Sequence, residues 1–230
     1  LHVLAANQEK FGYILKQPED EISAINMAIG ASYAGVRSMT ATSGGGFSLM
    51  TEAYGLAGIT ETPIVIFDGM RGGPATGLPT WSGQGDLQMA LHSHQDEFPR
   101  IVLAPGDVAE TYELTIEAFN LADKYQTPVV VLLDKNICEN DKTLLFPDTA
   151  KVKIDRGKFV KKKIDDYLRY KYEDDGVSVR SIPGVGNFFI ANSDEHNEEG
   201  YSTEEVEDRN KMMEKRMKKL LTCAENDMPN

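Results

Sequence analysis

The feature that most limits what this chain can fold into is the run Thr-Pro-Val-Val-Val-Leu-Leu at 127–133, which is apolar almost throughout. A strand of this kind is buried on both faces, as in a parallel sheet covered by helices. Shorter apolar or β-branched runs occur at 36–42, 63–67 and 100–104, and segments with helical spacing separate them. The alternation predicts an α/β domain, a three-layer fold with a parallel sheet between helices and right-handed crossovers.

Helices are expected at 18–33, 47–57, 85–93 and from 107 onward. Pro18 suits a first helical turn, acidic residues after it suit the positive end of the helix dipole, and Gly35 suits the residue after the helix. A short strand is expected at 11–15, and Ser43 to Gly46 are expected to form a turn between strand and helix.

The composition changes near residue 140. Residues 1–150 hold eight Lys and Arg against 19 Asp and Glu, whereas 151–230 hold 16 against 17 at a far higher charge density. We therefore expect one domain over 1–140 and a charged linker or arm over 141–230 that leads to another domain or subunit. A charged helix is expected in the arm at about 204–224. Its thin apolar stripe consists of Val206, Met213, Met217, Leu220 and Leu221.

The overall charge and the cysteines exclude several classes of function. A net charge of −12 argues against a general nucleic-acid-binding protein. No run approaches the roughly 18 apolar residues of a membrane span. Cys138 and Cys223 are the two cysteines, and they are expected to be reduced thiols in a cytoplasmic protein. An iron–sulfur cluster needs about four thiolates, so this chain cannot supply one alone.

The stretch from Arg71 to Leu87 is the strongest candidate for a binding loop. It follows an apolar strand and holds five of the 20 glycines, two of the 10 prolines and the only tryptophan. Long ordered loops are mostly lids or binding loops. The Arg71 guanidinium can bind a carboxylate through two parallel hydrogen bonds, and the Thr80 hydroxyl can donate another. The alternative is a surface arginine and a turn threonine in an ordinary polar connection.

Two other places could contribute to a site. Ser43 to Gly46 lie between a strand and a helix, where backbone N–H groups can bind an anion, or where glycines merely allow close packing. Glu21 shares a helix face with Ala24, Ile25 and Ala28. A carboxylate on such a face can share a proton with a heterocycle nitrogen, or it can simply favour the helix dipole.

Four motifs together resemble a known family. They are Glu-Asp-Glu-Ile-Ser-Ala-Ile-Asn-Met-Ala-Ile-Gly-Ala-Ser-Tyr-Ala-Gly at 19–35, Thr-Ala-Thr-Ser-Gly-Gly-Gly-Phe at 40–47, Arg-Gly-Gly-Pro-Ala-Thr-Gly-Leu-Pro-Thr at 71–80 and Gln-Gly-Asp-Leu at 84–87. The chain resembles the α subunit of 2-oxoacid:ferredoxin oxidoreductases, most strongly the 2-oxoglutarate type, over about residues 18 to 220.

The resemblance implies the pyrimidine-binding domain of the thiamine diphosphate fold. The family decarboxylates a 2-oxoacid, joins the acyl group to coenzyme A and passes electrons to ferredoxin. By position, Glu21 matches the glutamate at N1′ of the aminopyrimidine, and Arg71 and Thr80 match the residues that hold the 2-oxoacid. Thr42, Ser43 and Gly44 would line the cofactor pocket. A partner β subunit would hold the diphosphate, Mg²⁺ and an iron–sulfur cluster.

The chain departs from the family pattern in two places. Members usually have Thr-Ser-Gly-Pro-Gly where this chain has Thr-Ser-Gly-Gly-Gly at 42–46. They also carry an upstream Tyr-Pro-Ile-Thr-Pro turn, and nothing like it precedes Pro18, so we expect an N-terminal strand and helix of the domain to be missing from this sequence. The alternative hypothesis is a non-catalytic binding or assembly module with a degenerate thiamine fold. A copurifying β subunit would separate the two.

Overall fold

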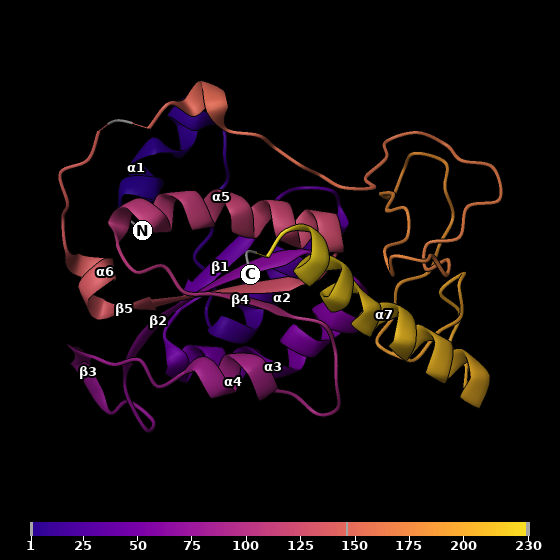
Figure 1. The fold of residues 1–230 in the computed structure, drawn as a ribbon, viewed down its shortest axis with the longest axis horizontal. Coiled ribbons are helices and arrows are strands. Elements are labelled where there is room, and N and C mark those ends of the chain that lie inside the picture. Colours follow the sequence, from indigo (N-terminus) through magenta and orange to yellow (C-terminus); the bar gives the residue numbers. More distant parts are fainter. Residues whose placement is uncertain (1, 146, 229–230) are drawn as a thin grey trace.

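The computed structural model describes residues 2–145 and 147–228. At its centre lie four parallel strands in the order β1-β2-β5-β4, and β3 pairs antiparallel with the end of β2 (Figure 1). The strands are β1 (Met39–Thr42), β2 (Ile64–Gly72), β3 (Leu78–Ser82), β4 (Ile101–Leu103) and β5 (Pro128–Asp134).

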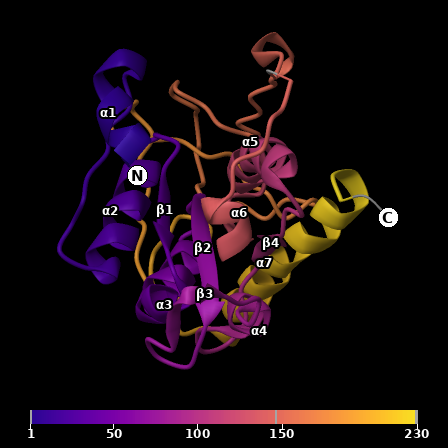
Figure 2. The ribbon, with the colours of Figure 1, turned by 90° about the vertical axis from the view of Figure 1, so that its left-hand side faces the viewer.

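Helices cover both faces of the sheet, as Figure 2 shows. The helices are α1 (His2–Phe11), α2 (Glu21–Tyr33), α3 (Gly44–Ile59), α4 (Leu87–His92), α5 (Val108–Tyr125), α6 (Lys135–Glu139) and α7 (Val206–Asn226), with a 3₁₀ turn at Thr149–Lys151. Helices α2, α3 and α4 pack on one face, and α5 packs on the other with α7 beside it. None of the helices in the described parts of the chain is long and apolar enough to cross a membrane.

The two cores alternate along β2 because successive side chains of a strand point to opposite faces. Ile64 and Ile66 belong to the core under α2, α3 and α4, whereas Val65 and Phe67 belong to the core under α5. Burial of apolar surface on both faces is the main stabilising contribution for such a sheet, at about 25 cal/mol for each Å² removed from water. The three-layer parallel fold expected from the sequence is confirmed.

The N-terminal expectations need two corrections. The strand expected at 11–15 is wrong, because α1 ends at Phe11 and the chain then runs without regular structure to the next helix. The helix expected from Pro18 begins at Glu21, because the Asp20 carboxylate accepts a hydrogen bond from the Ser23 N–H and so caps the helix. Gly35 follows the helix with φ +96°, as expected.

The long loop expected at 71–87 is wrong in part. Arg71 and Gly72 are the last residues of β2, and β3 returns antiparallel to them, with Arg71 opposite Ser82 and Gly72 opposite Leu78. A glycine at 83 is required, since a Cβ there would lie 2.6 Å from the Arg71 carbonyl carbon. Much of the stretch is therefore a hairpin rather than an irregular connection.

The apolar stripe expected on the C-terminal helix is wrong in part, since only Leu220 of its members packs against the core. Val206 and Leu221 are 73% and 66% exposed, and the helix buries a different face. The buried residues of α7 are Met212, Lys215, Arg216, Lys219 and Cys223. The cations are buried because each has an acid to pair with, as described below for Glu61.

The part of the chain after residue 140 has little regular structure before α7, as Figure 1 shows in orange and yellow, yet it buries Tyr170, Val177 and Arg180. Leu220 and Cys223 of α7 pack against the core beneath α5. The division into 1–140 and 141–230 stays a prediction, and its outer ends, residue 1 and residues 229–230, lie outside the described residues.

Candidate functional site

The candidate site is built around the first turn of α3, at the carboxyl end of β1. Ligands of open parallel sheets bind at this edge. The glycines expected to form a separate turn are the first residues of the helix, which begins at Gly44 after an extended Ser43. The Ser43 side chain does not cap the helix within the described structure. The first N–H groups of a helix lack partners inside it, so this turn presents donors and the positive end of a helix dipole.

Glu21 and Thr42 meet at Gly46. A Cβ added at Gly46 would overlap Thr42 Oγ1 and would lie 2.8 Å from Glu21 Oε1. A glycine is therefore required where the carboxylate of α2 and the hydroxyl of β1 converge on α3. The sequence prediction brought these two side chains to one site, and the structure places them there.

Arg71 reaches the same helix turn from β2. Its Nη2 lies 3.8 Å from the position of a Cβ at Gly45, as does the carbonyl oxygen of Ala75. Its Nε is buried and receives no acceptor from the described residues. A guanidinium held beside a helix N-terminus with an unused donor is suited to a carboxylate ligand.

Thr80 lies on the same hairpin but in an exposed strand. All five residues of β3 are exposed, and no hydrogen bond of the Thr80 side chain occurs within the described residues. Ser82 is opposite Arg71 and Leu78 is opposite Gly72, so the pairing shifts between Arg71 and Gly72, and Thr80 lies between the two paired positions of β3. Thr80 thus belongs to the hairpin that carries Arg71, and its role toward the substrate stays a prediction.

Two acids near the turn were missed by the sequence prediction. Asp68 of β2 is fully buried, and a Cβ at Gly44 would overlap the Asp86 Oδ2. Burial, and to a lesser extent the neighbouring Asp86 carboxyl, together raise the pKa of Asp68 to about 7. A signal existed for Asp68, since it is an acid inside an apolar strand, but its partner is remote in sequence.

The residues near the site do not form an evident metal centre. No group of three or more His, Cys, Asp or Glu side chains with metal-binding geometry occurs among the described residues. Cys138 of α6 is exposed, and its Sγ lies 3.7 Å from the position of a Cβ at Gly69. Burial, then Asp134 and Glu139, raise the pKa of this thiol, which keeps it protonated.

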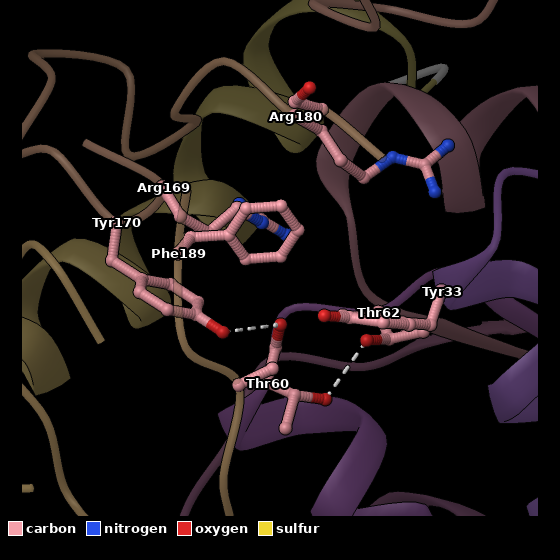
Figure 3. Close-up of a pocket in the computed structure, with 9 residues that line it drawn as sticks. Tyr33, Thr60, Thr62, Arg169, Tyr170, Arg180 and Phe189 are labelled. Carbon is pink, nitrogen blue, oxygen red and sulfur yellow. Dashed lines mark hydrogen bonds between the residues drawn. The ribbon is translucent and has the colours of Figure 1, made fainter. Parts of the chain in front are cut away.

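A small cavity lies at the opposite end of the strands, where the C-terminal part of the chain meets the turn between α3 and β2 (Figure 3). Its volume is about 10 Å³, which is room for about one water. The Thr60 and Thr62 hydroxyls bond each other at 2.9 Å, and the Tyr170 hydroxyl donates to the Thr60 carbonyl at 3.5 Å. This cavity is a packing contact between two parts of the chain.

Comparison with known proteins identifies the fold and the family. A family model described as "Pyruvate flavodoxin/ferredoxin oxidoreductase, thiamine diP-bdg" matches residues 1–215. The chain is 46% identical over 228 residues to the α subunit of 2-oxoacid:ferredoxin oxidoreductase 1 of Sulfurisphaera tokodaii. That match covers 98% of this chain and 36% of the relative.

Two further proteins agree. The 2-oxoglutarate synthase subunit KorA of Archaeoglobus fulgidus is 44% identical over 170 residues, which is 74% of this chain and 49% of the relative. The solved 2-oxoglutarate:ferredoxin oxidoreductase of Magnetococcus marinus, with 2-oxoglutarate, coenzyme A and succinyl-CoA bound, superposes with a TM-score of 0.92 at 38% identity. It is matched over 100% of this chain and 40% of its own chain. The chain therefore spans half or less of these proteins, and it belongs to the thiamine diphosphate-binding family of pyruvate flavodoxin/ferredoxin oxidoreductases.

Proposed function

We propose that this chain is part of the α subunit of a 2-oxoacid:ferredoxin oxidoreductase. The reaction is the oxidative decarboxylation of a 2-oxoacid, in the first place 2-oxoglutarate, to acyl-CoA and CO₂ with reduction of ferredoxin. The observation that carries the proposal is the convergence of Glu21, Thr42 and Arg71 on the first turn of α3. The names of the relatives support the reaction and the choice of 2-oxoglutarate.

The residues fit the aminopyrimidine end of thiamine diphosphate. The absence of a side chain at Gly46 lets the Thr42 hydroxyl and the Glu21 carboxylate approach the first turn of α3 together. Glu21 would hold a proton at N1′ of the ring, and Thr42, Ser43 and Gly44 would line the pocket. When bound, the cofactor supplies the electron sink that decarboxylation of a 2-oxoacid requires.

The same turn suits the substrate carboxylate. Arg71 offers a bidentate donor pair beside the positive end of α3, and Thr80 offers a hydroxyl on the same hairpin. The exposed hairpin of β2 and β3 would cover the substrate and exclude water from the reacting atoms. These contacts orient a carboxylate that all 2-oxoacids share, so the rest of the substrate must be selected by other residues.

The remaining groups are assigned to a partner β subunit. The cluster needs about four thiolates, and the sequence of this chain has two cysteines. The diphosphate and Mg²⁺ are assigned to the same partner, which leaves this chain the pyrimidine half of a shared site. Coenzyme A and ferredoxin bind the assembled complex, and the cytoplasm is the expected compartment.

The test is a panel of 2-oxoacids given to the complete complex with coenzyme A and a viologen as electron acceptor. Substrate-dependent viologen reduction that is fastest with 2-oxoglutarate is expected. The matched variant Arg71→Ala should raise KM for every 2-oxoacid that is turned over. The proposal would be refuted by a complex that contains its partner subunit and thiamine diphosphate but does not reduce viologen with any 2-oxoacid of the panel.

A further inference from the structure

Asp68 is a buried acid whose position needs an explanation. It lies on β2, between Thr42 of β1 and Leu132 of β5, and on the face that carries Ile66 and Met70. It is fully buried, and neither carboxylate oxygen receives a hydrogen bond from the residues that the structure describes. An ionised carboxylate in such a place is costly, so a proton or another group must satisfy it.

Asp86 is the polar side chain that faces Asp68. It is near enough for the two carboxyl groups to share a hydrogen bond when one of them carries a proton. Asp86 precedes α4 but does not cap it, because no hydrogen bond runs from that helix to the Asp86 side chain. Its Oδ2 is buried against Gly44 of α3 instead, and no donor among the described residues reaches it. Both acids are thus turned inward, toward each other.

We propose that Asp68 and Asp86 share one proton and that this pair is the positioning device that holds the Gly83–Asp86 segment against the first turn of α3. Two carboxyl groups in contact cannot both be ionised without strong repulsion, so one of them keeps its proton. The raised pKa of Asp68, caused first by burial and then by Asp86, agrees with this arrangement.

The pair matters because the short segment is fixed at three points. Gly83 lies against the Arg71 backbone, and the Gln84 Nε2 donates to Asp134 Oδ2 at 2.8 Å. Asp86 supplies the third point, at Gly44. The proton between the acids therefore sets the distance between the end of β2, which carries Arg71, and the helix turn that faces it. The part of this inference that concerns binding of a 2-oxoacid rests on the proposed function.

Other charged and titratable groups surround the pair. Glu21 of α2 lies across Thr42, and Arg71 lies over the same helix turn. On the other side, Cys138 of α6 is close enough for Asp68 to influence its pKa, and Asp134 caps α6. Arg71 faces the same helix turn, so ionising the second acid adds negative charge to the surroundings in which the substrate carboxylate is proposed to bind.

The decisive variant is Asp68→Asn in the complete complex. The amide keeps the shape and donates a hydrogen bond to Asp86 at every pH, so it imitates the protonated acid. For the unchanged protein, KM for the 2-oxoacid should rise about three- to tenfold between pH 6.5 and 8.5, since one pKa unit of interaction corresponds to a factor of ten. KM of Asp68→Asn should stay low over that range. In both proteins kcat should change less than KM.

A second measurement needs no turnover. The folded protein keeps the Asp68 proton that the unfolded chain loses near pH 4, so its stability falls as pH rises from about 4 to about 7 and is then level. The midpoint of thermal unfolding of Asp68→Asn should match the unchanged protein near pH 4 and exceed it by about 5 °C at pH 7.5, given roughly 2–4 °C per kcal/mol in a chain of this size. The exposed Asp165→Asn is the matched control and should follow the unchanged protein.

The outcomes separate the possibilities. If Asp68→Asn follows the unchanged protein in both KM and unfolding, the acids share no proton and the inference is wrong. If millimolar Mg²⁺ or Ca²⁺ raises the unfolding midpoint of the unchanged protein but not of Asp68→Asn, a cation bridges the acids, which also overturns it. If neither the unchanged complex nor the Asp68→Asn complex turns over a 2-oxoacid, the proposed function fails. The unfolding comparison still decides whether Asp68 and Asp86 share a proton.

Discussion

Lys219 of α7 forms a fully buried ion pair with Glu61, which lies just after α3. Lys215, one helical turn earlier, pairs with the other oxygen of the same carboxylate, and the Arg169 guanidinium donates to the Glu61 carbonyl at 2.7 Å. One carboxylate thus offsets two buried ammonium groups. The C-terminal helix is fixed to the sheet domain by charge as much as by apolar packing.

Removing the shared acid should be more damaging than removing either base. Glu61→Gln leaves two buried ammonium groups without an anion and should lower the free energy of unfolding by about 3–5 kcal/mol. Lys219→Met leaves the Glu61–Lys215 ion pair in place. It should lower the free energy of unfolding by less than about 2 kcal/mol, because an apolar side chain of similar length replaces a desolvated charge. Chemical denaturation measures both, and equal losses would contradict the account.

The same acid should make the protein sensitive to low pH. Burial alone would raise the pKa of Glu61, but Lys215 and Lys219 outweigh it and hold the pKa well below its usual range. The folded state therefore keeps the charge that an unfolded chain loses near pH 4.5, so this contribution is present above that pH and is lost as pH falls. The stability gap between the unchanged protein and Glu61→Gln should narrow from pH 6 to pH 3. A gap that stays constant would show that Glu61 is not held ionised.

Glu21→Gln should abolish most of the activity and leave the fold intact. The amide cannot hold the proton that the carboxylate would share with N1′, and losses of about 10²- to 10⁴-fold are usual for such groups. Glu19→Gln is the control, because Glu19 is an exposed acid just before the same helix. Turnover of Glu21→Gln within threefold of the control, in complexes of equal cofactor content, would exclude the assigned role.

Gly46→Ala should displace Thr42 or Glu21 from the first turn of α3. The added Cβ would overlap Thr42 Oγ1, so either the hydroxyl or the carboxylate must move. We expect weaker thiamine diphosphate binding, measured by titration of the complex, by at least about tenfold, which is 1.4 kcal/mol. Gly30→Ala in the last turn of α2 is the control, since no described atom beyond its chain neighbours and the helix's own backbone lies within 4 Å of its Cβ position, and it should stabilise the helix by about 0.5–1 kcal/mol. Unchanged binding in Gly46→Ala would contradict the assignment.

The three-layer fold and part of the candidate site could be predicted from the sequence. Particular residues show why the remaining features could not. The apolar strands and the spacing of helices are local patterns, so the parallel sheet followed from them. Glu21, Thr42 and Arg71 lie in motifs, and the ends of parallel strands bring them together. Glycines and prolines after Arg71 favour a loop, and the pairing that makes β3 depends on close backbone approach at Gly83.

Long-range pairing explains the features that were missed. Lys215 and Lys219 have the spacing of a solvent-exposed helix face, and their acid lies 154 residues before Lys215 in the sequence. Asp68 stands out as an acid inside the apolar strand β2, whereas Asp86, just before a helix, is ordinary as a single residue. Only folding places them face to face, so neither the buried charge of α7 nor the acid pair has a local signature.

The most direct test of the account is a structure of the complete complex with thiamine diphosphate and a 2-oxoacid bound. The account predicts the Glu21 carboxylate at N1′ of the aminopyrimidine and the substrate carboxylate on Arg71, next to the Gly44–Gly46 turn. An aminopyrimidine bound away from Glu21, or a 2-oxoacid held without Arg71, would contradict it.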